Sequence, residues 1–169
     1  ATLQYLVGGD GNAAAQIDQF FDPESDGYLG DRAGVASLVA GHSYFTDAGD
    51  SARIALREQV RQKTEAYGIR YWQSEYSMLG DGYKEGKTGR IPAMDCALFL
   101  SKMIHHDLVV GGASAWQWWN AFENGPSEFD TRYYLLALNE QFDDDEGDFS
   151  ITKNLWAFGH YSRFIRPGM

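Results

Sequence analysis

The fold of this chain is decided by one stretch, YWQSEYSML at residues 71–79. The stretch predicts a short buried strand that ends in the carboxylate of Glu75, with aromatic residues around it and the glycine-rich loop of residues 80–90 after it. A carboxylate at the carboxyl end of a strand, in aromatic surroundings, is where α/β barrels place catalytic groups. A Glu at this position can also form an ordinary structural ion pair with a nearby Arg, and the residue types leave both interpretations open.

A strand and a helix are predicted directly before this stretch. The apolar run of residues 35–44 predicts a strand that ends near His42 and Tyr44, whose side chains should share a face because they lie two residues apart. Residues 50–67 predict an amphipathic helix that stops at Gly68. Strand, helix and strand with short connections predict a βαβ unit with a right-handed crossover. The apolar side of the helix is predicted to hold Ala52, Leu56, Val60 and Tyr67, opposite its Arg, Glu, Gln and Lys residues.

A third strand is predicted over residues 108–119, and it ends in the aromatic segment AWQWWN. Three Trp in four residues are hard to explain by core packing alone, because alternate side chains of a strand face opposite ways. One of two pairs should therefore face the site. These pairs are Trp116 with Trp118, and Gln117 with Trp119.

The remaining segments are predicted to be helices and loops. Residues 92–106 form a helix that is apolar nearly all round and should be mostly buried, with Cys96 as a reduced core residue. The loop of residues 80–90 lacks the spacing of a phosphate-binding loop and is expected to be mobile above the site. Ser150 is expected to cap the last helix, and Gly111-Gly112 should mark a bend or a close packing contact.

Composition and charge exclude some classes of partner. The chain has 24 acidic and 14 basic residues, a net charge of −10 and a pI near 4.7, so its surface should repel nucleic acid and anionic membranes. Aromatic residues make up 15% of the chain, which suits carbohydrate binding because flat rings stack on the apolar faces of sugars. No apolar stretch approaches the roughly 20 residues that a membrane helix needs.

No metal or other cofactor is predicted. The acidic run of residues 143–148 lacks the ligand spacing and the distal Glu of a calcium-binding loop, so a solvated acidic loop is the expected structure. His105 and His106 are adjacent on a helix and should point apart, which disfavours a shared metal ion. The start at Ala1 without an initiator Met, and the end in residues 165–169 at what reads as the entry to another element, predict a piece of a longer polypeptide.

Four segments together resemble glycoside hydrolase family 30, in the order and spacing of that family. They are GHSYFT at residues 41–46, WQSEYS at 72–77, ASAWQWWN at 113–120 and LWAFGHYSRFIRPG at 155–168. The resemblance implies an α/β fold, the C-terminal part of a (β/α)8 TIM barrel with about its last three βα units, since 169 residues are fewer than the roughly 250 of a complete barrel. It implies a partial catalytic domain at residues 1–163, with residues 164–169 starting a linker or strand into a β-sandwich.

Members of this family are secreted retaining enzymes that act on β-linked glycans, so the resemblance implies a secreted or periplasmic hydrolase without a cofactor. Its partners would be a β-linked oligo- or polysaccharide, together with the N-terminal barrel strands and the β-sandwich of the parent chain. By the same resemblance Glu75 matches the nucleophile and Tyr44 the hydroxyl that bonds to it. His42 lies beside Tyr44, although for a single His an ordinary core position is the commoner role.

The resemblance also assigns a role to the aromatic segment and shows that a second catalytic carboxylate is missing from the predicted strands. Trp119 matches the floor of the sugar subsite beside the cleaved bond, with Trp116 or Trp118 nearby. A retaining enzyme needs a second carboxyl group about 5–5.5 Å from the nucleophile, and none of the three strands predicted above ends in the Asn-Glu pair that carries it in this family. Three other glutamates are predicted to lie in loops and are poor substitutes: Glu85, Glu123 and Glu128.

Two alternatives to a segment of a retaining hydrolase stay open. The chain could be a non-catalytic carbohydrate-binding module that uses the platform of Trp116 to Trp119. It could also be a scaffold fragment that neither binds nor cleaves glycans. Among substrates, the resemblance slightly favours β-1,6-galactan or β-1,6-glucan over xylan and simple glucosides.

Overall fold

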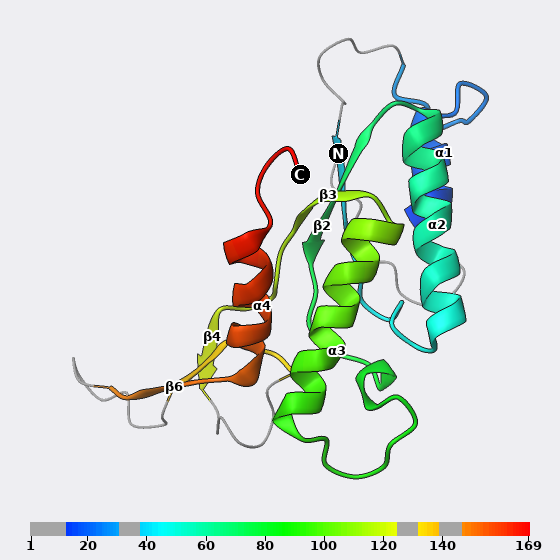
Figure 1. Ribbon diagram of the computed structural model, residues 1–169. Coiled ribbons are helices and arrows are strands. Elements are labelled where there is room, and N and C mark those ends of the chain that lie inside the picture. Colours follow the sequence, from blue (N-terminus) through cyan, green and yellow to red (C-terminus); the bar gives the residue numbers. More distant parts are fainter. Residues whose placement is uncertain (1–12, 31–37, 125–131, 139–146) are drawn as a thin grey trace. The chain divides into compact units, whose positions relative to one another are not determined.

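The computed structural model describes residues 13–30, 38–124, 132–138 and 147–169, which form two compact units (Figure 1). The first unit contains the described residues up to Tyr76 together with Ile104–Gln117, and the second contains the described residues of Ser77–Met103 and Trp118–Met169. Within the described residues, no helix is both long and apolar enough to cross a membrane. The described helices and strands make this a mixed α/β protein.

A parallel three-stranded sheet organises the first unit. Its strands are β1 (Leu38–His42), β2 (Arg70–Glu75) and β3 (Ala113–Trp116), in the order β1-β2-β3. The strands predicted around residues 35–44 and 71–79 are therefore confirmed, although residues 35–37 lie outside the described residues. Because all three strands are parallel, their carboxyl ends meet at one edge of the sheet.

The helix α2 (Asp50–Ala66) connects β1 to β2 and confirms the predicted strand, helix and strand unit. Gly68 follows it with a φ of 64°, the left-handed conformation expected at a helix stop. The predicted core face was wrong in part, because Ala52 is exposed and Leu56 only half-buried. The buried residues of α2 are Arg53, Arg57, Val60 and Thr64.

The core of the first unit lies between the sheet and its helices. The helix α1 (Ala13–Phe21) packs against α2, and Figure 1 shows the two helices side by side. The Tyr67 hydroxyl donates a hydrogen bond of 2.8 Å to Asp18, which raises the pKa of Tyr67 to about 12. The central apolar cluster consists of Ile17, Val39, Val60, Tyr71 and Ala113.

The segment before β3 differs from its prediction. The helix α3 (Ala93–His105) continues into a π-helix, η2 (His106–Val110), so the predicted strand start at Leu108 was wrong. The expected close contact at the glycine pair is confirmed, because a Cβ on Gly111 would lie 2.8 Å from the carbonyl oxygen of Asp107. A larger residue at this position would push η2 away from the strand that follows it.

Burial along α3 is one-sided rather than complete. Cys96 is buried as expected, but Met94 and Leu98 are 52% and 62% exposed, so the prediction of nearly all-round burial was wrong. The loop of residues 80–90 contains the short 3-10 helix η1 (Gly82–Lys84). Ion pairs tie this loop to α3, between Lys87 and Asp95 at 2.6 Å and between Lys102 and Glu85.

The second unit carries a small mixed sheet. Its strands are β4 (Phe122–Asn124), β5 (Leu136–Leu138) and β6 (Phe149–Ile151), with β4 parallel and β6 antiparallel to β5. The helix α4 (Lys153–Phe164) begins after Thr152, so the predicted cap at Ser150 was wrong. Ser150 instead lies in β6, where it pairs with Ala137 of β5.

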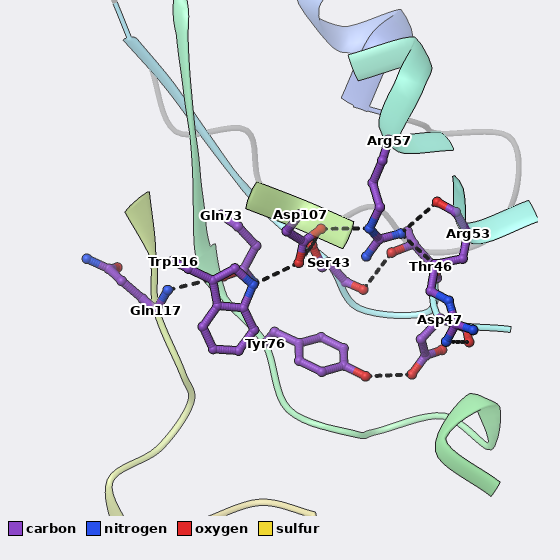
Figure 2. A network of polar contacts seen from close by, with 10 residues as sticks. All are labelled: Ser43, Thr46, Asp47, Arg53, Arg57, Gln73, Tyr76, Asp107, Trp116 and Gln117. Atoms are coloured by element: carbon purple, nitrogen blue, oxygen red, sulfur yellow. Dashed lines mark hydrogen bonds and ion pairs between the residues drawn. The ribbon is translucent and has the colours of Figure 1, made fainter. Parts of the chain in front are cut away.

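A buried ion pair connects α2 to η2 in the first unit. The Arg57 Nε atom lies 2.7 Å from Asp107 Oδ1, and the two side chains are only 5% and 2% exposed. Figure 2 shows this pair among the polar contacts of the unit. Arginine stems can cover apolar surface while the guanidinium binds oxygen atoms, which explains why two arginines of α2 lie on its buried side.

We expect Arg57→Met to lower the free energy of unfolding by about 3–5 kcal/mol, because it leaves the Asp107 carboxylate buried without its compensating charge. Urea denaturation of the variant and wild-type proteins measures this change. The matched control is Arg61→Met on the same helix, whose partner Glu65 is exposed, and it should leave stability nearly unchanged. Similar losses in both variants would contradict a special role for the buried pair.

Candidate active site

The candidate site lies at the carboxyl edge of the parallel sheet in the first unit, where open α/β sheets bind their ligands. A register shift shapes this edge: Gly41 of β1 pairs with Gln73, whereas the next residue, His42, pairs with Glu75. Ser74 is therefore an extra residue in β2, and its hydroxyl donates to the carbonyl oxygen of Gly41 at 3.2 Å. Bulges of this kind redirect side chains, and here the redirected residue is Glu75.

The structure brings together three of the residues predicted for the site. The Tyr44 hydroxyl donates a hydrogen bond of 3.0 Å to Glu75 Oε1, and His42 Nε2 lies 3.8 Å from Glu75 Oε2. The Glu75 side chain is 28% exposed, so its carboxylate is oriented by protein groups and still reaches solvent. A carboxylate in this state can act as a nucleophile or as a base.

Tyr44 reaches Glu75 by a different route from the predicted one. The strand β1 ends at His42, so Tyr44 lies in the following loop rather than on a shared strand face. Its side chain is 2% exposed, and the next residue, Phe45, has a φ of 58°, in the left-handed region that bulky residues rarely adopt. Loop conformation, rather than strand alternation, delivers the hydroxyl to the carboxylate.

Aromatic rings continue from Tyr44 to the end of β3. The ring centroid of Tyr44 lies 6.0 Å from that of Tyr76, which lies 6.2 Å from that of Trp116. The Trp116 indole nitrogen donates to Asp107 Oδ2 at 2.8 Å, so the indole of this predicted site residue is anchored in the buried polar network of Figure 2. Trp116 thus adjoins the Tyr44 and Glu75 pair through Tyr76.

Tyr76 is a site neighbour that the sequence analysis did not single out. Its hydroxyl donates to Asp47 Oδ2 at 2.8 Å, and its side chain is fully buried. Burial, together with the nearby Asp47 charge, raises the pKa of Tyr76 well above its usual value, so the phenol stays neutral and keeps donating. The position of Tyr76 directly after Glu75 is the feature of the sequence that could have indicated a supporting role.

The other two predicted tryptophans belong to the second unit. Trp119 is 54% exposed, and Trp118 is half-buried. An exposed indole offers a flat apolar face to a sugar ring, so the chemistry of Trp119 agrees with a binding role. The placement of Trp118 and Trp119 beside Glu75 stays a prediction.

The other carboxylates of the chain differ in burial and in their partners. Asp47 and Asp107 are buried in the first unit, and each accepts hydrogen bonds from protein groups. Glu85 pairs with Lys102, and Glu123 is exposed on β4. Glu128 lies outside the described residues.

Among the described residues, no group of three or more His, Cys, Asp and Glu side chains is arranged to hold a metal ion. Most of the acidic run at residues 143–148 falls outside the described ranges. The described site is thus built from a carboxylate, a phenol and an imidazole.

Comparisons with known proteins identify a family and a similar fold. The model of O-glycosyl hydrolase family 30 matches residues 2–130. Among solved structures, a conserved exported protein from Bacteroides fragilis is 25% identical, with a TM-score of 0.73 over 91% of this chain and 32% of that protein. The catalytic domain of a family 30 xylanase C from Talaromyces cellulolyticus is 21% identical, with a TM-score of 0.46 over 78% of this chain and 25% of the other.

The match to the family model covers most of the chain, whereas the chain spans only 32% and 25% of these two solved structures. The matched residues include all three strands of the parallel sheet and with them His42, Tyr44 and Glu75. The chain therefore belongs to O-glycosyl hydrolase family 30.

Proposed function

We propose that this chain carries the nucleophile side of a retaining glycoside hydrolase site, with Glu75 as the nucleophile. The observation that carries the proposal is the hydrogen bond from Tyr44 to one oxygen of a partly exposed carboxylate at the end of a parallel strand. Barrel enzymes place catalytic groups at this end of their strands. Membership of a glycosyl hydrolase family supplies the reaction type.

In the proposed reaction, Tyr44 holds Oε1 of Glu75 and leaves Oε2 to attack the anomeric carbon of a β-linked sugar. The bond from Oε2 to the sugar forms as the glycosidic bond breaks, and a separate acid gives a proton to the leaving oxygen. The same group then takes a proton from water, which displaces Glu75 and releases the sugar with its original configuration. Two inversions produce overall retention.

The second carboxyl group is proposed to come from outside residues 1–169. Asp47 and Asp107 serve buried contacts, and an acid about 5–5.5 Å from Glu75 is required. On this proposal β1, β2 and β3 are the sixth, seventh and eighth strands of a (β/α)8 barrel, and residues 164–169 lead into a β-sandwich. Three parallel strands in sequential order support this arrangement.

The proposed substrate is a β-linked oligo- or polysaccharide, with Trp119 stacking on the sugar next to the cleaved bond. The exposed indole and the aromatic rings around Glu75 support this class of ligand. β-1,6-Galactan and β-1,6-glucan are the first polymers to test. A secreted or periplasmic location is proposed, and the similarity to a protein described as exported supports it.

Glu75→Gln is expected to abolish hydrolysis while leaving glycan binding largely intact, because the amide keeps the shape but loses the nucleophilic charge. The assay compares β-1,6-galactan, β-1,6-glucan, xylan and para-nitrophenyl β-glycosides. It uses the 169-residue chain and the longer protein that carries it. We expect turnover by the longer protein alone.

Each other outcome of this assay identifies a different function. Glycan binding without hydrolysis by the unmodified longer protein would indicate a carbohydrate-binding module, and neither binding nor hydrolysis would indicate a scaffold. Activity of the short chain that depends on Glu75 would place the second carboxylate inside residues 1–169. Full activity of Glu75→Gln would disprove the proposed nucleophile.

Trp119→Ala is expected to lower kcat/KM about tenfold, which corresponds to the loss of about 1.4 kcal/mol of stacking in the bound sugar. The matched control is Trp156→Ala, because Trp156 lies on α4 and is similarly exposed, at 61% against 54%. Steady-state kinetics on the active substrate measure both variants. A larger loss from the control would argue against Trp119 as the sugar platform.

A further inference from the structure

We propose that Ser43, Arg57 and Asp107 are positioning residues that hold the Tyr44 loop so that its hydroxyl meets Glu75. This inference rests on the proposed function of Glu75 and extends it to three side chains that do not touch the carboxylate in any described contact. They are buried, polar, and placed on three different segments of the first unit. Their shared task is to fix the loop that links β1 to α2.

Asp107 is the centre of this arrangement. Its carboxylate is 2% exposed and lies 2.7 Å from Arg57 Nε, on α2. The Ser43 hydroxyl lies 3.2 Å from both carboxylate oxygens, and the indole nitrogen of Trp116 donates to Oδ2 at 2.8 Å. Figure 2 shows these groups converging on Asp107 from the loop, the helix and the end of β3.

The same groups hold the Tyr44 loop on both sides of the tyrosine. Ser43, directly before it, bonds to Asp107, and the carbonyl oxygen of Thr46, two residues after it, accepts a hydrogen bond of 3.0 Å from Arg57 Nη1. Between these anchors Phe45 adopts a φ of 58°. An unfavourable backbone conformation persists only where surrounding contacts hold it in place. The contacts of Ser43 and Thr46 on either side therefore stabilise the left-handed conformation of Phe45.

The network also reaches the residue that follows Glu75. The Asp47 carboxylate accepts from the Tyr76 hydroxyl at 2.8 Å, and the Asp47 carbonyl oxygen accepts from Arg53 Nη1 at 3.2 Å. The loop that carries the donor, Tyr44, is thus tied to the segment that carries the acceptor, Glu75. Both partners of the 3.0 Å hydrogen bond are fixed by one set of buried contacts.

Ser43→Ala is the most selective test, because it removes one anchor and leaves Arg57 and Trp116 on Asp107. In the longer active protein we expect kcat to fall about fivefold, less than the roughly 100-fold loss that a 1 Å misplacement can cause. KM should change little, and the melting temperature should fall less than it does in Arg57→Met, because Arg57 and Trp116 still compensate the Asp107 charge. The probe is the para-nitrophenyl β-glycoside that the unmodified protein hydrolyses fastest.

A double-mutant cycle with Tyr44→Phe separates positioning from general stabilisation. If Ser43 acts through the Tyr44 hydroxyl, Ser43→Ala should change kcat by less than about twofold once that hydroxyl is gone. The matched control is Ser114→Ala, which removes a serine hydroxyl bonded to the Tyr71 carbonyl oxygen at 3.1 Å in the same sheet. Its effect should be small and equal in both backgrounds.

The outcomes distinguish this inference from the proposed function. If Glu75→Gln is inactive and Ser43→Ala lowers kcat equally with and without Tyr44→Phe, or has no effect, the positioning role is overturned and the nucleophile stands. If Glu75→Gln remains active, the proposed function itself fails. Loss of kcat that disappears in the Tyr44→Phe background supports both.

Discussion

The Asp107 carboxylate is the constraint on which the first unit depends, because it is 2% exposed and has to replace its hydration with protein donors. Those donors come from separate segments: Arg57 from α2, Ser43 from the loop after β1, and Trp116 from the end of β3. Displacement of any one of these donors would leave the buried charge of Asp107 poorly compensated. The sheet, the helix and the loop are therefore held in a common arrangement by electrostatics as well as by apolar packing.

This arrangement has a direct consequence for the site. The bulge at Ser74 turns Glu75 toward the carboxyl edge of the sheet, and the loop of residues 43–47 brings Tyr44 to it. A loop alone would sample many conformations, since fixing each residue costs about 1–2 kcal/mol of backbone entropy. The buried contacts offset that entropy and leave the Glu75 carboxylate partly exposed.

The local predictions succeeded where neighbouring residues decide the structure. The apolar runs of β1 and β2, the stop at Gly68 and the contact at Gly111 were all recognised because each follows from the residue types within a few positions. The helix α2 shows the limit of this reasoning. Arg53 and Arg57 were assigned to its polar side, yet both are buried. Arg57 binds the carboxylate of Asp107, far away in the sequence, and Arg53 binds the carbonyl oxygen of Asp47 in the loop just before the helix.

The sequence by itself determined the family, the unit of β1, α2 and β2, and the position of Glu75 at the end of β2, because these depend on short motifs and on runs of apolar residues. Only the tertiary structure decided how Tyr44 reaches Glu75, and only the tertiary structure brought Asp107 into contact with the loop that carries Tyr44. Asp107 is 64 residues from Ser43, and no local pattern reports a contact over that separation. Polar side chains on a helix look solvent-facing in sequence until folding supplies a buried partner.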